Sequence, residues 1–120
     1  METKPFHVHD DDRQIMIKKD RIQAKHWVEH LGFIDREIAY LIKLSSGFRE
    51  QLEMIRKQNE LLISALSAYD TRIADMAECD DMECEVYYLE QHEDFRNGFI
   101  NHRKQYEVLK EALFSELLAK

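Results

Sequence analysis

The apolar residues in the middle of the chain form one uninterrupted line with helical spacing. From Phe48 to Met76 the line alternates steps of four and three residues, and Asn59 is its one polar member. Its members are Phe48, Leu52, Ile55, Asn59, Leu62, Leu66, Tyr69, Ile73 and Met76. A repeat of about 3.5 residues keeps a single stripe of a helix facing its partner helices. The pattern therefore predicts a long helix over residues 48–77 with one face buried in a bundle.

Similar lines of apolar residues occur on both sides of this segment. A predicted helix over 15–44 has the seam Trp27, Leu31, Ile34, Ile38 and Leu41, which Ile22 and Ile42 widen. A predicted helix over 82–118 has the seam Glu85, Tyr88, His92, Phe95, Phe99, His102, Tyr106, Leu109 and Leu113. No stretch alternates apolar and polar residues for long, so strands have little support. The three seams predict an all-α, antiparallel three-helix bundle with coiled-coil-like heptad packing.

Two interruptions of the pattern mark the predicted turns. Ser45, Ser46 and Gly47 are poor helix formers; Gly47 suits the left-handed residue that ends many helices, and a neighbouring Ser suits a helix cap. The acidic residues of 78–82 suit the start of the third helix. Because the first seam continues in phase into Phe48, an alternative remains at the first turn. One helix of about sixty residues, about 90 Å long, would form a long helical hairpin that dimerises.

The composition is consistent with long helices and a single domain. The chain has 120 residues, three Gly, one Pro and a charged fraction of 34%, which exceeds the usual fraction of about 25%. Residues 1–13 include Pro5 and an acidic run and have little to bury, so a flexible acidic N-terminal tail is expected there. Residues 14–120 are then the single helical bundle domain.

The charge and the cysteine content limit the expected partners and location. A net charge of −7 argues against nucleic acid, which requires a clustered basic face. Two Cys give no disulfide framework and suit a reducing compartment. The first twelve residues are too polar for a signal peptide, and no run approaches the ~18 apolar residues of a membrane span. We expect a cytoplasmic protein with no membrane or nucleic-acid partner.

Polar residues of the three seams are predicted to meet inside the bundle. Counting residues away from the two turns gives two polar layers: His30 with Asn59 and His102, and His26 with Tyr69 and His92. Buried polar groups must be paired, so these side chains are expected to bond one another, the backbone or water. A single polar seam residue fixes register at a cost in stability. Asn59→Leu is therefore predicted to raise the melting temperature while loosening helix pairing, whereas a fall would indicate a satisfied network.

The alternative role for these histidines is a metal site between helices. His26 and His30 are four residues apart and share a face, and His92 with Glu60, Glu93 or Glu85 would complete a site for iron or zinc. The Glu-x-x-His pairs of ferritin-like di-iron proteins and the His-Glu-x-x-His motif are absent. The sequence therefore favours histidines that form hydrogen bonds, with no cofactor.

The remaining chemistry favours a protein that binds rather than catalyses. The serines lie in predicted helices or the first turn, and three glycines cannot form a phosphate-binding loop. Apolar residues outside the seams either widen the buried stripes or mark a surface for a partner or a homodimer. They are Phe33, Tyr40, Met54, Leu61, Ile63, Tyr87, Ile100 and Phe114. We expect a non-enzymatic interaction or assembly module whose partner is another protein or a second copy, as a homodimer.

Overall fold

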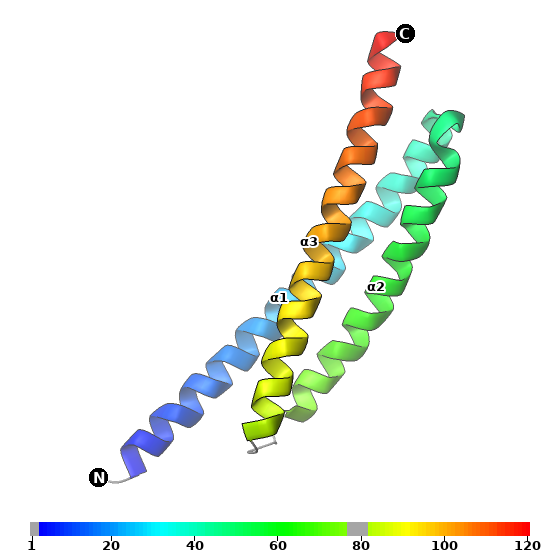
Figure 1. Ribbon diagram of the computed structural model, residues 1–120. Coiled ribbons are helices and arrows are strands. Elements are labelled where there is room, and N and C mark those ends of the chain that lie inside the picture. Colours follow the sequence, from blue (N-terminus) through cyan, green and yellow to red (C-terminus); the bar gives the residue numbers. More distant parts are fainter. Residues whose placement is uncertain (1–2, 77–81) are drawn as a thin grey trace.

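The structure is an all-α arrangement of three helices (Figure 1). The computed structural model describes the backbone of residues 3–76 and 82–120, and the side chains of residues 14–73 and 87–120. Helix α1 spans Thr3–Leu44, α2 spans Arg49–Met76 and α3 spans Met82–Ala119, with a short 3₁₀ helix, η1, at Ser46–Phe48. No strand occurs in the described backbone. The predicted three-helix bundle is confirmed.

Consecutive helices run in opposite directions (Figure 1). Ion pairs join Arg21 of α1 to Asp70 of α2 and Asp35 of α1 to Arg56 of α2. Moving along the bundle in one direction, residue numbers therefore rise in α1 and fall in α2. Since α3 reverses direction again, it runs alongside α1 in the same sense. This order places residues that are far apart in the sequence at the same level of the bundle.

The chain turns between α1 and α2 at the predicted place, but by a different conformation. Helix α1 ends at Leu44, and Ser45 is extended, with φ −144° and ψ 112°. The Ser45 N–H still donates to the Leu41 carbonyl at 3.1 Å. No residue of the described backbone, Gly47 included, has a positive φ, and the Ser45 side chain makes no capping hydrogen bond. An extended serine therefore breaks the helix, and the alternative of one continuous sixty-residue helix is wrong.

The first helix begins earlier than expected. The predicted start was near residue 15, after a tail of residues 1–13, but α1 begins at Thr3. Pro5 lies in its first turn, where a missing N–H has no acceptor within the helix and so does not disrupt it. No other Pro or Gly precedes Gly32, so nothing stops the helix before the bundle. The predicted second turn falls on 77–81, outside the described residues.

The described members of the three predicted seams are buried or half-buried. Fully buried apolar side chains include Leu31, Ile34, Ile38, Leu52, Leu66, Ile73 and Leu113, and each contributes about 1.5–3 kcal/mol through burial. Ile17 and Ala24 extend the α1 seam toward the N-terminus, whereas Ile22 is 49% exposed and does not widen it. Trp27 stacks on Phe99 with ring centroids 5.7 Å apart. This core fixes the levels at which polar side chains meet.

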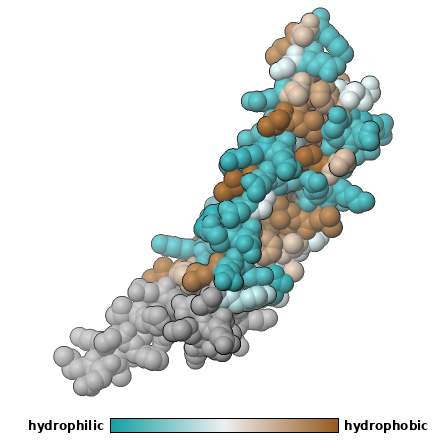
Figure 2. Space-filling view, in the orientation of Figure 1, coloured by the Kyte–Doolittle hydropathy of each residue, from teal (hydrophilic) through white to brown (hydrophobic). Residues whose placement is uncertain are grey.

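The surface of the described residues carries both hydrophilic and apolar side chains. In Figure 2 the apolar residues form brown patches among teal ones on the side that faces the viewer. None of the helices, over the residues that the structure describes, is long and apolar enough to cross a membrane.

Candidate functional site

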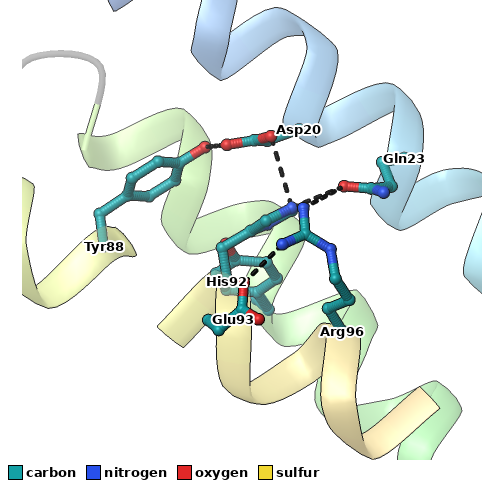
Figure 3. Close-up of polar contacts among 7 residues, drawn as sticks. Asp20, Gln23, Tyr88, His92, Glu93 and Arg96 are labelled. Atoms are coloured by element: carbon teal, nitrogen blue, oxygen red, sulfur yellow. Dashed lines mark hydrogen bonds and ion pairs between the residues drawn. The ribbon is translucent and has the colours of Figure 1, made fainter. Parts of the chain in front are cut away.

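The first polar cluster surrounds His92 of α3 (Figure 3). The Tyr69 hydroxyl of α2 lies 2.7 Å from His92 Nδ1, and Gln23 Oε1 of α1 lies 2.7 Å from His92 Nε2. Asp20 Oδ1 lies 3.4 Å from the same nitrogen, and the Tyr88 hydroxyl donates to the other oxygen of that carboxylate. The cluster therefore links one side chain of α2 and two each of α1 and α3.

The partners of His92 determine its protonation. Gln23 Oε1 is an acceptor, since Arg96 also donates to it at 3.4 Å, so His92 Nε2 carries the proton and donates. His92 Nδ1 then accepts from the Tyr69 hydroxyl. Burial lowers the pKa of His92, although the nearby Asp20 carboxylate acts in the opposite direction. His92 is therefore a neutral imidazole with both nitrogens engaged.

The two tyrosines of the cluster are held in their protonated forms. Burial raises the pKa of Tyr88, and its hydrogen bond to Asp20 raises it further. Burial, followed by the charge of Asp20, raises the pKa of Tyr69. Tyr69, Tyr88 and His92 are 1%, 3% and 4% exposed. A hydrogen-bonded series of Tyr, Asp, His and Tyr side chains has the composition of a proton relay. Here, however, these groups bond to one another and do not face solvent.

The second polar cluster is centred on Asn59 of α2, which is fully buried. Asn59 Nδ2 donates to the Leu31 carbonyl of α1 at 2.7 Å. Asn59 Oδ1 is therefore the acceptor for His102 Nε2 of α3, at 2.8 Å. Burial lowers the pKa of His102, which favours the neutral ring. One amide side chain thus connects all three helices through two hydrogen bonds.

A third polar cluster lies nearer the α1–α2 turn and connects α1 to α3. The Tyr106 hydroxyl donates to Glu37 Oε1, and Lys110 Nζ donates to the same oxygen at 2.9 Å. Burial raises the pKa of Glu37, but the two donated hydrogen bonds and the Lys110 charge outweigh it, so the net pKa is lowered. The seam pattern did not predict this cluster, although Glu37 and Tyr106 lie within about one turn of the same level when residues are counted from the turns.

The predicted polar layers are partly assembled by the structure. Asn59 meets His102, and Tyr69 meets His92, as counting along the helices predicted. His26 and His30 are exposed and enter neither layer, so these two assignments are corrected. Each lies one position before a buried residue of α1, His26 before Trp27 and His30 before Leu31. Their places are taken by Gln23 with Asp20 and by the Leu31 carbonyl.

The residues of the metal hypothesis do not come together. His26, His30, Glu60 and Glu93 are exposed, and the side chain of Glu85 lies outside the described residues. Both nitrogens of His92 are occupied by Tyr69 and Gln23. Within the described residues, no group of three or more His, Cys, Asp or Glu side chains is placed to hold a metal ion.

Two surface hollows of the described chain lie away from the polar clusters. One, between α1 and α2, is lined by Ala24, Val28, Ser67 and Asp70 among others. Another, between α2 and α3, includes Met54 and Gln105. Lys25 and Glu29 also line the first hollow, but its Asp70 is paired with Arg21, and among the described hydrogen bonds none joins the Ser67 hydroxyl to a base, as nucleophilic catalysis requires.

No protein-family model, curated protein or solved structure matches the chain. The fold and the three polar clusters define it as a helical bundle with polar bonds between its helices.

Proposed function

We propose that this chain is a non-enzymatic helical module of the cytoplasm that acts by binding another protein or a second copy of itself. The observation that carries the proposal is a line of exposed apolar side chains on α1. Its members are Ile15, Ile22, Phe33, Tyr40 and Leu44, whose exposed fractions range from 49% for Ile22 to 68% for Tyr40. They are separated by 7, 11, 7 and 4 residues. Such spacings return to the same side of a helix at about 100° per residue.

This line is separate from the buried seam of α1. Leu31, Ile34 and Ile38 form the seam and are at most 1% exposed, whereas Phe33 and Tyr40 lie about a third of a turn away. Isolated apolar residues on a surface are ordinary. The line extends over thirty residues, about 45 Å of helix, with His26 and Glu29 on its side between Ile22 and Phe33, and an exposed apolar side of a helix is the pattern that a partner helix binds. The exposed line therefore supports a binding role.

The interior polar groups support a structural role rather than catalysis. His92, His102 and Asn59 form their hydrogen bonds with other helices of the same chain. A catalytic acid or base needs a substrate within hydrogen-bonding reach. No observation on the described residues favours the metal-binding alternative, which metal analysis of untagged protein tests independently.

The experiment compares two exposed apolar residues that lie on different helices. Phe33→Glu changes the α1 line, and Leu61→Glu changes an outward position of α2 that is 67% exposed. Purified wild type and both variants are used to capture partners, and each captured protein is then purified and titrated by calorimetry. We expect stoichiometric binding by wild type and Leu61→Glu, and a loss of at least tenfold in affinity for Phe33→Glu, about 1.4 kcal/mol. Equal binding by all three, or catalytic turnover by the chain, would overturn the proposal.

A further inference from the structure

Helix α3 carries its own exposed or half-exposed apolar line beside α1. It consists of Leu89, Ile100, Phe114 and Leu118, which are separated by 11, 14 and 4 residues. Lys110, which reaches α1 through Glu37, precedes Phe114 by one turn and lies on the α1 side of this line. The α1 and α3 lines therefore flank the same side of the bundle. We call this surface the α1–α3 face.

The two apolar lines lie at matching levels. In the contacts between α1 and α3, the α3 residue number exceeds the α1 number by 65 to 73, and in three of the hydrogen bonds by 68 or 69, so we use an offset of 69. Ile22 is therefore level with residue 91, near Leu89, and Phe33 is level with residue 102, near Ile100. Leu44 is level with residue 113, beside Phe114. Apolar side chains therefore occur on both helices near three common levels.

One edge of the α1–α3 face is basic. Lys18, Lys25, Arg36 and Lys43 follow Ile15, Ile22, Phe33 and Tyr40 by three residues each. All four basic side chains are exposed, and none makes an ion pair within the described part of the chain. A step of three residues places them on the side of the line away from α3, because Glu37, which contacts α3, follows Phe33 by four. Glu29 is the acidic exception on this edge.

The opposite edge of the face is mainly acidic. Glu93, Glu107 and Glu111 of α3 are exposed and lie along or outside its apolar line. Glu93 pairs with Arg96 and Glu107 with Arg103 on the same helix, whereas Lys104 is a basic residue outside the line. Applying the same offset, Lys25 is level with residue 94, Arg36 with residue 105 and Lys43 with residue 112. Three of the four basic residues, all except Lys18, are therefore within two residues of the level of an acidic one. Glu29, at the level of residue 98, is close to the level of Arg96.

We propose that the occupant of the α1–α3 face is a second copy of this chain, related by a two-fold axis that runs parallel to the bundle. The proposal rests on the proposed binding function and specifies its partner. This axis places α1 of each copy on α3 of the other, at equal levels and in the same direction. Apolar lines then meet apolar lines, and the basic edge of one copy meets the acidic edge of the other. An axis across the bundle would instead bring the two basic edges together.

The face is large enough for a stable dimer. About 45 Å of paired helices with a width of about 20 Å gives about 900 Å² per copy, and standard interfaces bury about 800 Å² per partner. Because the two copies lie side by side at the same level, the dimer retains the 72 Å length of one chain. An end-to-end dimer would be considerably longer.

The test reverses charge on each edge separately. Variant one carries Arg36→Glu and Lys43→Glu, and variant two carries Glu107→Lys and Glu111→Lys. Sedimentation equilibrium of wild type is expected to give a dimer that weakens with added salt. Each variant alone is expected to dimerise about 100-fold more weakly, since the two-fold axis repeats every reversed pair. An equimolar mixture of the two variants is expected to form a heterodimer near wild-type affinity, because both of its contacts are again complementary.

Further measurements separate folding from association. Circular dichroism verifies that each variant is helical, Leu61→Glu serves as the off-face control, and Lys104→Glu is expected to tighten the dimer because it lies near the level of Arg36. Small-angle scattering of the dimer is expected to preserve the monomer's length. A wild-type chain that stays monomeric overturns the second copy as occupant, yet leaves the proposed binding of another protein intact. A dimer that is indifferent to both charge reversals, or a mixture that fails to pair, overturns this face as the interface.

Discussion

Replacing Asn59 by Leu tests whether the central polar cluster stabilises the bundle. Seam position alone predicts that this change raises the melting temperature, because an apolar residue replaces a buried amide. The structure indicates the opposite result. Asn59 is fully buried, donates to the Leu31 carbonyl and accepts from His102 Nε2. Leu at this position removes both bonds and leaves the His102 N–H without its partner.

The free-energy costs and gains of Asn59→Leu differ enough to predict that the variant is less stable. Two lost hydrogen bonds account for about 1–3 kcal/mol, and a buried donor left unpaired costs about 1–3 kcal/mol more. Burying a Leu side chain returns about 1.5–3 kcal/mol. The Leu31 carbonyl retains its bond within α1, so the unpaired His102 dominates. We expect a net loss of about 1–2 kcal/mol, or a fall in Tm of about 3–8 °C for a chain of this size.

The assay is urea unfolding followed by circular dichroism at pH 8, where both buried histidines are neutral. Asn59→Leu is compared with Asn101→Leu, an exposed position on α3, which is expected to change stability by no more than about 0.5 kcal/mol. The double variant Asn59→Leu/His102→Leu removes the donor as well, and is expected to be more stable than Asn59→Leu alone. An increase in Tm for the single variant would refute the claim that these hydrogen bonds outweigh an apolar layer.

Three further predictions follow from the same contacts. Burial lowers the folded-state pKa of His92 and His102 below the ordinary 6.5. As the pH falls, the unfolded chain therefore binds protons before the folded chain does. The free energy of unfolding is expected to fall below about pH 6.5, by at most ~1.4 kcal/mol per pH unit for each histidine. His102→Gln should flatten that slope in urea titrations from pH 8 to 5, and an unchanged slope would count against the assignment. Tyr106→Phe removes a donor to Glu37 and is expected to cost about 1 kcal/mol and raise the Glu37 pKa toward 4.5, as carbon-detected NMR titration can measure; a static pKa would contradict the bond. Gly47→Ala is expected to be neutral or stabilising by up to about 1 kcal/mol, because Gly47 has no positive φ and an added Cβ meets only the Ser45 hydroxyl at 3.9 Å; a clear fall in Tm would contradict this.

The candidate site was predictable where a polar residue occupied a seam position. Asn59, Tyr69, His92 and His102 lie on the seams of α2 and α3, so their burial followed from spacing alone. Their partners on α1 were harder to predict. Asp20 and Gln23 bond through the flexible ends of their side chains, and the Leu31 acceptor is backbone. The pattern of apolar residues therefore predicts neither kind of partner.

The sequence by itself determined which residues are buried and how many helices the chain forms, because helical spacing specifies a face before any partner is present. It also determined the interruption at Ser45–Gly47, since three weak helix formers occur together there. Only the tertiary structure decided how that interruption is built, with an extended Ser45 and no left-handed glycine. It also decided that His26 and His30 stay exposed, with the His30 ring against the edge of Phe99 and not in a polar layer, since the direction of α3 from α1 depends on the packing of all three helices. Pairing across a bundle depends on that packing, and one-dimensional spacing does not contain it.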